Sequence, residues 1–126
     1  MKIHVLSDLH LEHFMHSIRF MPCNELSVDL VILAGDIGEG VEGIERTKQW
    51  YPDTPILYVP GNHEYYGHEL YSINQDMDEF CRDSRVTLLN PGIIEIQDTV
   101  FIGCTLWCQH RFKMSTFHRS KMTCVR

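Results

Sequence analysis

The chain has 126 residues and a formal net charge of -6, with 44% hydrophobic and 22% charged residues. This length fits one domain with a modest core, and the composition is that of a soluble globular protein rather than a disordered or fibrous one. No apolar stretch reaches the roughly 18 residues of a membrane span, and Ser7 and Asp8 interrupt the start too early for a signal peptide. We therefore expect a cytoplasmic protein without a membrane partner.

Three short apolar runs come first in the chain, at residues 3–6, 30–34 and 56–59. They are rich in β-branched or aromatic residues and apolar on both faces, which is typical of buried parallel strands. Between the first two runs, residues 11–28 are interpreted as a helix followed by a loop.

Helical spacing of apolar residues predicts a helix over 38–51 and, more strongly, one over 65–83. Alternating strands and helices predict a parallel sheet with right-handed crossovers. Three further short strands are expected at 86–89, 93–96 and 100–106, with tight links between them. The predicted fold is α/β: a mostly parallel sheet of β-α-β units followed by a hairpin.

The composition changes after residue 107. Residues 108–126 carry five Lys or Arg and no acidic residue, whereas all 17 acidic residues lie before them. We expect a domain over 1–107 and a basic tail over 108–126 that is solvated, disordered or unrelated to the domain. The five cysteines fit no usual structural zinc spacing and are interpreted as free thiols or small core residues.

Polar residues follow each of the first three predicted strands. Asp8 and His10 follow the first, Asp36 the second, and Asn62 and His63 the third. Ligands bind at the carboxyl ends of parallel strands in open α/β sheets, so these side chains are expected in one crevice. Asp8 and His10 are two residues apart, and an extended backbone would project both to the same side.

The donor types in this set are carboxylate, imidazole and amide oxygen, which suit Mn, Fe or Zn better than Ca or Mg alone. A carboxylate can also bridge two cations about 4 Å apart, which together activate a hydroxide and hold both oxygens of an in-line displacement at phosphorus. The pattern therefore indicates a site for divalent metal ions.

Glycines support this interpretation, because Gly35 and Gly61 stand directly before Asp36 and Asn62. Glycine allows a sharp turn and brings the backbone close to an ion or a phosphate. Asp8 and Asp36, taken singly, are also common helix N-caps. The order and spacing of the whole set favour ligands over caps.

Three blocks carry a family resemblance. Ser7-Asp8-Leu9-His10-Leu11-Glu12, Gly35-Asp36 and Gly61-Asn62-His63-Glu64 resemble the first signature blocks of the calcineurin-like metallophosphoesterases. Gly103-Cys104-Thr105-Leu106-Trp107 is similar to the strand that follows in many bacterial members. The resemblance covers residues 1–107 and implies about half of a four-layer α/β/β/α sandwich.

The resemblance also implies roles for the five polar residues. Asp8 and His10 would bind a first metal ion, Asp36 would bridge two, and Asn62 would bind the second. His63 would contact the phosphate and protonate the leaving oxygen as a general acid. Substrates would be phosphate mono- or diesters, attacked in line by a metal-bound hydroxide.

The family's later Gly-His and Gly-His-x-His blocks have no counterpart here, since only His110 and His118 follow Trp107 and neither has a glycine before it. The second cation would keep only Asp36 and Asn62, so we expect a weakened or single-ion site. The chain is interpreted as a fragment, a truncated product or the product of a shifted reading frame.

Two residues and two other functions stay open. Glu12 and Glu64 either support the site or lie at the surface. The chain could instead be a truncated remnant without activity, an interaction module that self-associates through an uncovered sheet. Nucleic-acid binding through the basic tail is disfavoured by the net charge, so nucleic acid is expected only as a substrate.

Overall fold

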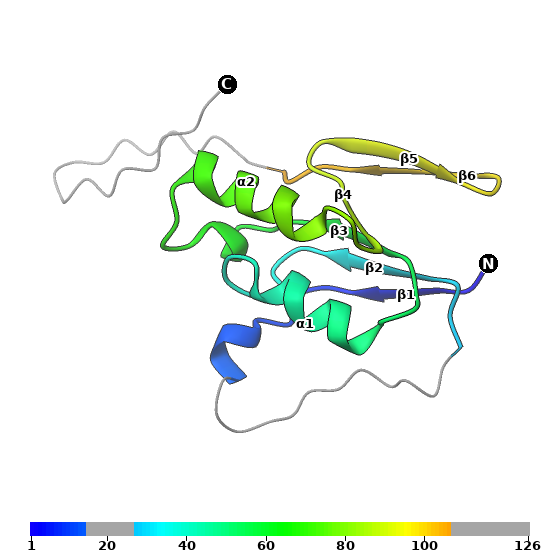
Figure 1. The fold of residues 1–126 in the computed structure, drawn as a ribbon, viewed down its shortest axis with the longest axis horizontal. Coiled ribbons are helices and arrows are strands. Elements are labelled where there is room, and N and C mark those ends of the chain that lie inside the picture. The colour runs from blue at the N-terminus through cyan, green and yellow to red at the C-terminus, as the bar shows by residue number, and fades with distance from the viewer. Residues whose placement is uncertain (15–26, 107–126) are drawn as a thin grey trace, which may run out of the picture.

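Four parallel strands form the centre of the fold (Figure 1). The computed structural model describes residues 1–14 and 27–106. In spatial order the strands are β1 (Ile3–Leu6), β2 (Leu30–Ala34), β3 (Ile56–Val59) and β4 (Val86–Leu88). Their order in the sheet is their order in the chain, and every neighbouring pair is parallel. All four strands therefore point their carboxyl ends to the same edge.

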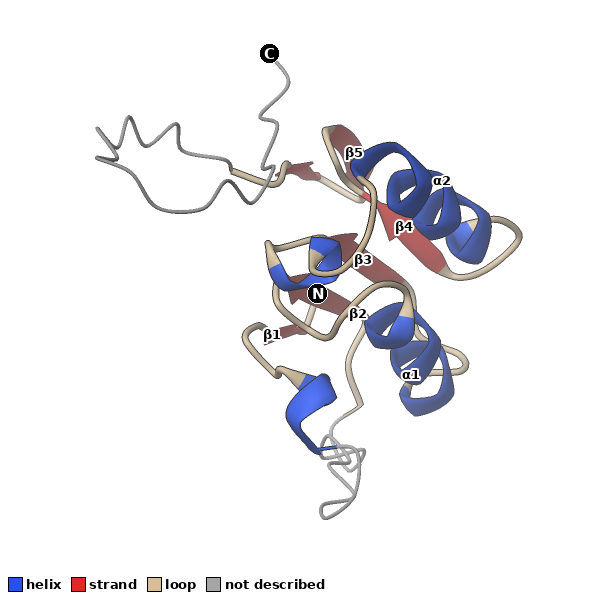
Figure 2. Ribbon diagram, turned by 90° about the vertical axis from the view of Figure 1, so that its left-hand side faces the viewer, coloured by secondary structure: helices blue, strands red, loops and turns tan. Residues whose placement is uncertain are grey.

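Both α-helices lie on one face of this sheet (Figure 2). They are α1 (Glu42–Trp50) and α2 (Leu70–Cys81), and two 3-10 turns, Leu11–Phe14 and His63–Tyr65, follow β1 and β3. Ile44 of α1 and Ile73 and Met77 of α2 are buried against the sheet. The side chain of Glu69 caps α2 by accepting a hydrogen bond from Ser72 N at 2.8 Å.

The opposite face of the sheet is covered in part by an antiparallel hairpin, β5 (Gly92–Ile96) and β6 (Thr99–Gly103). Leu57 of β3 belongs to the apolar cluster between the hairpin and the sheet, in which Ile94 and Phe101 also pack. These two residues face each other across the hairpin. The central strands are thus buried on both faces, which explains why their sequences are apolar throughout.

The far face of the hairpin is apolar and exposed. Ile93 and Ile102 pair across the two strands and are 72% and 76% exposed. Ile3 and Val5 on β1, the outermost strand of the parallel sheet, are also exposed. Within the described residues, the helix-free side of the molecule therefore presents uncovered apolar surface.

The predicted α/β fold with its parallel sheet and terminal hairpin is confirmed, with shorter elements than expected. Both helices begin four or five residues later than predicted, and β6 ends at Gly103 rather than at 106. The segment expected as a helix and loop begins with one 3-10 turn; its residues 15–26 and the basic tail lie outside the described residues. Within the described ranges, no helix has the length and apolar character needed to cross a membrane.

The two faces of the hairpin should differ in their effect on stability. Leu57→Ala opens a cavity between sheet and hairpin and should lower the free energy of unfolding by about 2–5 kcal/mol. Ile102→Ala, on the exposed face, should change it by less than about 1 kcal/mol. Urea unfolding followed by circular dichroism measures both, and equal losses would contradict the two-faced packing.

Candidate active site

The loops that follow β1 and β2 run side by side at the carboxyl edge of the sheet. Three backbone hydrogen bonds join them: Asp8 N to Gly35 O (3.0 Å), His10 N to Asp36 O (3.1 Å) and Leu11 N to the carbonyl oxygen of Ile37 (3.0 Å). Strand pairing thus continues as a backbone ladder into the polar region. It fixes the first block of polar residues against the second.

The backbone in this ladder is not extended. Asp8, His10 and Asp36 have φ angles of 52°, 47° and 54°, in the left-handed region that few non-glycine residues adopt. The extended backbone from which Asp8 and His10 would project to the same side therefore does not continue beyond β1. Three of the five polar residues that the sequence singled out lie in this left-handed region, together with Asp83 and Gln97 outside the site. Such strain concentrates at functional sites.

These turns bring Asp8, His10 and Asp36 together, each offering a ligand atom within 4.8 Å of the others. Two carboxylates and one imidazole make a donor set that fits a divalent transition ion. His10 and Asp36 are half-buried, whereas Asp8 is exposed to solvent. A cation held here would be open to solvent on the side of Asp8.

The loop after β3 approaches Asp36 so closely that only glycine fits at position 61. A Cβ on Gly61 would overlap the carboxylate and the backbone nitrogen of Asp36. The backbone N–H of His63 donates to Asp36 Oδ1 at 2.9 Å. This contact orients the Asp36 carboxylate and places His63 beside it.

Asn62 is exposed, and its Nδ2 donates to the Tyr66 hydroxyl at 2.6 Å. This bond leaves the amide oxygen of Asn62 as its acceptor for a cation. The Tyr66 ring also lies against His63, with ring centroids 4.5 Å apart. Tyr66, which the sequence analysis did not single out, therefore contacts two of the predicted site residues.

His63 lies among other ionisable side chains from the loop after β1. Its Nδ1 is 2.8 Å from Glu12 Oε1 and 3.2 Å from His10 Nδ1. The Glu12 side chain is only 10% exposed. Burial by itself raises the pKa of the Glu12 carboxyl, but a backbone hydrogen bond and the neighbouring His63 and His13 outweigh it and keep that pKa below its usual value.

Glu64 is fully buried and binds the loops after β2 and β3 together. Its carboxylate accepts hydrogen bonds from the backbone N–H groups of Asp36 (3.2 Å), Ile37 (2.9 Å) and Gly61 (2.8 Å), and from the Tyr58 hydroxyl (2.8 Å). Burial and the adjacent Glu64 raise the pKa of Tyr58 well above its usual value, so its hydroxyl stays a donor.

Glu12 and Glu64 were expected either to support the site or to lie at the surface. The structure favours support of the site, because Glu64 is fully buried and the Glu12 side chain is 10% exposed. The signal available in the sequence was their position, directly within the first and third blocks. Composition and hydropathy give no such signal, because a glutamate reads as a surface residue on both.

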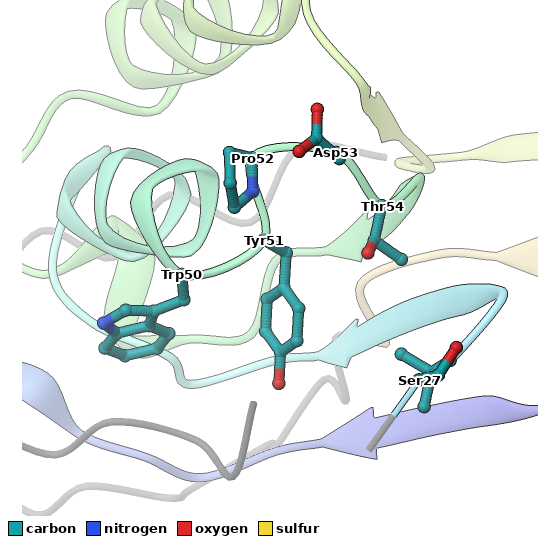
Figure 3. A pocket seen from close by; sticks show the side chains of 7 residues that line it. Ser27, Trp50, Tyr51, Pro52, Asp53 and Thr54 are labelled. Atoms are coloured by element: carbon teal, nitrogen blue, oxygen red, sulfur yellow. The ribbon is translucent and has the colours of Figure 1, made fainter. Parts of the chain in front are cut away.

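A shallow hollow elsewhere on the molecule does not coincide with this cluster (Figure 3). It is lined by Ser27, Val28 and residues 50–54, which precede β2 and β3 and so lie at the amino ends of the strands. Asp53 is the one charged residue of its lining, and its side chain is 94% exposed. The hollow therefore lacks the convergent polar groups expected of an active site.

Glu64→Ala should destabilise the fold, because it leaves four donors, two of them buried, without their acceptor. We expect a loss of at least about 3 kcal/mol in the free energy of unfolding, measured by urea denaturation. Glu45→Ala, on the exposed side of α1, serves as the control and should change it by less than about 0.5 kcal/mol. A loss below about 1 kcal/mol for Glu64→Ala would show that the carboxylate is not needed to hold the loops.

A comparison with family profiles shows the family of this chain. The sequence profile described as "Calcineurin-like phosphoesterase" matches residues 1–121. An uncharacterized protein of Acanthamoeba polyphaga mimivirus is 30% identical over 121 residues, an alignment that covers 81% of this chain and 42% of the viral protein.

A similar solved structure is the crystal structure of phosphopantetheinyl hydrolase from Mycobacterium tuberculosis, with a TM-score of 0.51 and 18% sequence identity, over 84% of this chain and 42% of that one. The likeness confirms the fold. The chain spans less than half the length of both proteins. The profile match, the shared fold and the three blocks at the carboxyl edge of the sheet place this chain in the calcineurin-like phosphoesterase family.

Proposed function

We propose that this chain carries the first half of a metal-dependent phosphoesterase site, acting on phosphate mono- or diesters. The observation that supports this most directly is the meeting of Asp8, His10 and Asp36 within 4.8 Å, on left-handed backbone turns. Their donor types suit Mn, Fe or Zn. A bound divalent cation would supply an activated water and polarise a phosphoryl oxygen.

The polar residues of the candidate site have different roles in the proposed mechanism. Asp8, His10 and Asp36 hold a first cation, and Asp36 with the amide oxygen of Asn62 reaches toward a second. His63 stands next to this cluster, with its backbone bonded to Asp36. In the proposed mechanism His63 contacts the phosphate and gives a proton to the leaving oxygen, the role of a general acid.

The two cation positions differ in strength. Three side chains hold the first, whereas the described residues supply the second with only Asp36 and Asn62. Two protein ligands are too few to retain a transition ion tightly unless solvent or another chain completes its shell. We therefore propose one firmly held cation, a weak second one and low activity for the 126-residue chain; its cytoplasmic location stays a prediction.

The first cation can be tested by binding. Asp36→Asn should lower the affinity for Mn²⁺ at least about tenfold, because it removes the negative charge nearest both proposed ions. Titration calorimetry and hydrolysis of 4-nitrophenyl phosphate and its bis-ester are the measurements. Asp53→Asn, whose side chain is 94% exposed, is the matched control and should bind Mn²⁺ like the wild type.

Two results would contradict this proposal. One is unchanged Mn²⁺ binding in Asp36→Asn. The other is rapid turnover that survives the substitution, since the cation proposed to drive hydrolysis would then be held elsewhere.

A second function is supported by the exposed apolar face of the hairpin. Ile93, Val100 and Ile102 are 72%, 57% and 76% exposed, and neighbouring apolar residues of this extent mark association surfaces. On this proposal the chain associates with another copy through β5 and β6. It need not be an enzyme to do so.

Self-association predicts a concentration-dependent mass. Sizing chromatography with light scattering should give a dimer or larger species for the wild type and a monomer for Ile102→Glu, because a buried charge opposes the contact. Gln97→Glu, at the hairpin turn, adds the same charge away from the apolar pair and should leave the mass unchanged. A wild-type monomer at all concentrations would dismiss this second function.

A further inference from the structure

Asn62 stands at the start of the 3-10 turn His63–Tyr65 but does not cap it with its side chain. Asparagine at the start of a helical turn usually has an extended backbone, and its side-chain oxygen accepts a backbone N–H. Here φ and ψ are -82° and -25°, and no side-chain capping bond forms. Among the described residues, the amide oxygen Oδ1 of Asn62 accepts no hydrogen bond. The common structural use of an asparagine at this place is therefore absent.

The other end of the Asn62 amide is held by Tyr66. Nδ2 donates to the Tyr66 hydroxyl at 2.6 Å, across the turn that separates the two residues. Tyr66 is itself fixed at two points: its backbone N–H donates to the carbonyl oxygen of His63 at 3.0 Å, and its ring lies 4.5 Å from the His63 ring. The tyrosine is thus an anchored partner for an exposed side chain.

Without this partner, the nearest charge would favour the wrong end of the amide. A half-turn of the amide group exchanges oxygen and nitrogen with little change of shape, so hydrogen bonds decide which end faces the site. Both neighbours of Asn62 touch Asp36: a Cβ on Gly61 would overlap its carboxylate, and the His63 N–H donates to Oδ1 at 2.9 Å. A carboxylate attracts an amide N–H, which would leave the oxygen turned away from a shared cation. The Tyr66 hydroxyl opposes this by accepting from Nδ2.

We propose that Tyr66 is the positioning residue for Asn62: its hydroxyl holds the amide nitrogen and so presents Oδ1 to the second divalent cation. This rests on the proposed function, in which Asp36 and Asn62 are the ligands of that cation. Metal ligands are commonly oriented by the partner of their other polar atom. Orientation before binding lowers the ordering cost that the cation must offset, which matters most where only two side chains bind it.

The orientation of the amide can be measured without any cation. In ¹⁵N-labelled wild type, nuclear Overhauser contacts should join the Nδ2 protons of Asn62 to the Tyr66 ring protons next to the hydroxyl. The bonded Nδ2 proton should also exchange with water more slowly than its partner on the same nitrogen. Tyr66→Phe keeps the ring beside His63 and removes only the hydroxyl, so the contacts should weaken and the difference in exchange should disappear.

Tyr71→Phe is the matched control. Tyr71 is 69% exposed on α2, and its hydroxyl accepts from Nε2 of Gln75, also four residues along, at 3.3 Å. This substitution removes the same kind of bond away from the candidate site. It should change the signals of Gln75 and leave those of Asn62 as they are in the wild type.

Cation binding gives a second readout. In a calorimetric titration with Mn²⁺, Tyr66→Phe should keep the first, tighter step and weaken the second about tenfold. Asn62→Ala should weaken the second step at least as much, and Tyr71→Phe should alter neither. Dispersed backbone amide spectra show that each variant is folded. A role confined to folding would disturb both steps together or neither.

Three results would overturn the role of Tyr66. They are wild-type Nδ2 protons of Asn62 without contacts to the Tyr66 ring, loss of both binding steps in Tyr66→Phe, and a second step that Asn62→Ala weakens but Tyr66→Phe does not. A wild type without a second step would count against the proposed function, while the amide spectra would still decide whether Tyr66 orients Asn62.

Discussion

The buried carboxylate of Glu64 accepts four hydrogen bonds, and the geometry of the candidate site depends on them. Three come from backbone N–H groups in the loops after β2 and β3, and one from the hydroxyl of Tyr58 in β3. A buried charge is tolerated only when it is bonded this fully. The two loops are therefore held in register by one side chain that touches neither substrate nor cation in the proposed mechanism.

Because the loops are fixed in this way, the fold tolerates backbone strain at the proposed ligand positions. Asp8, His10 and Asp36 adopt left-handed backbone conformations, each costing roughly 1–3 kcal/mol. The ladder between the loops after β1 and β2 and the Glu64 bonds oppose this cost. The result is a cluster of ligand atoms that exists before any cation arrives, which lowers the free energy of ordering that binding must supply.

The sheet beneath the site is unevenly covered. Helices α1 and α2 cover one face. Val31 and Tyr58 of the sheet and Met77 of α2 are inaccessible to solvent there. On the other face the hairpin covers Leu30 and Leu57, while β1 remains uncovered within the described residues. The segment leaving β6 returns to the site edge, where the Thr105 hydroxyl donates to the carbonyl oxygen of Pro60 at 2.6 Å. The segment after β6 thus links the hairpin to the edge of the sheet where the candidate site lies.

The arrangement also separates two kinds of support for the histidines. Glu64 acts through backbone N–H groups and fixes where the loops lie, whereas Glu12 contacts the His63 ring itself. Both are glutamates within the signature blocks; Glu64 is fully buried, whereas the Glu12 side chain is 10% exposed. One therefore supports the backbone of the loops, and the other contacts a side chain of the site.

The local pattern of the sequence was sufficient for the strands, the two helices and the hairpin, because hydrophobic periodicity and turn residues act over a few neighbours. It also predicted that Asp8, His10 and Asp36 would meet, since the carboxyl ends of parallel strands share an edge. It did not predict the left-handed backbone that brings them together.

The burial of Glu64, the contact of Tyr66 with Asn62 and the pairing of Glu12 with His63 were decided only by the tertiary structure. Glu12 and His63 are 51 residues apart, and Glu64 bonds to Asp36 across 28. A glutamate reads as a surface residue until the fold surrounds it with donors, so contacts between distant segments, rather than local preference, determined how this site is held.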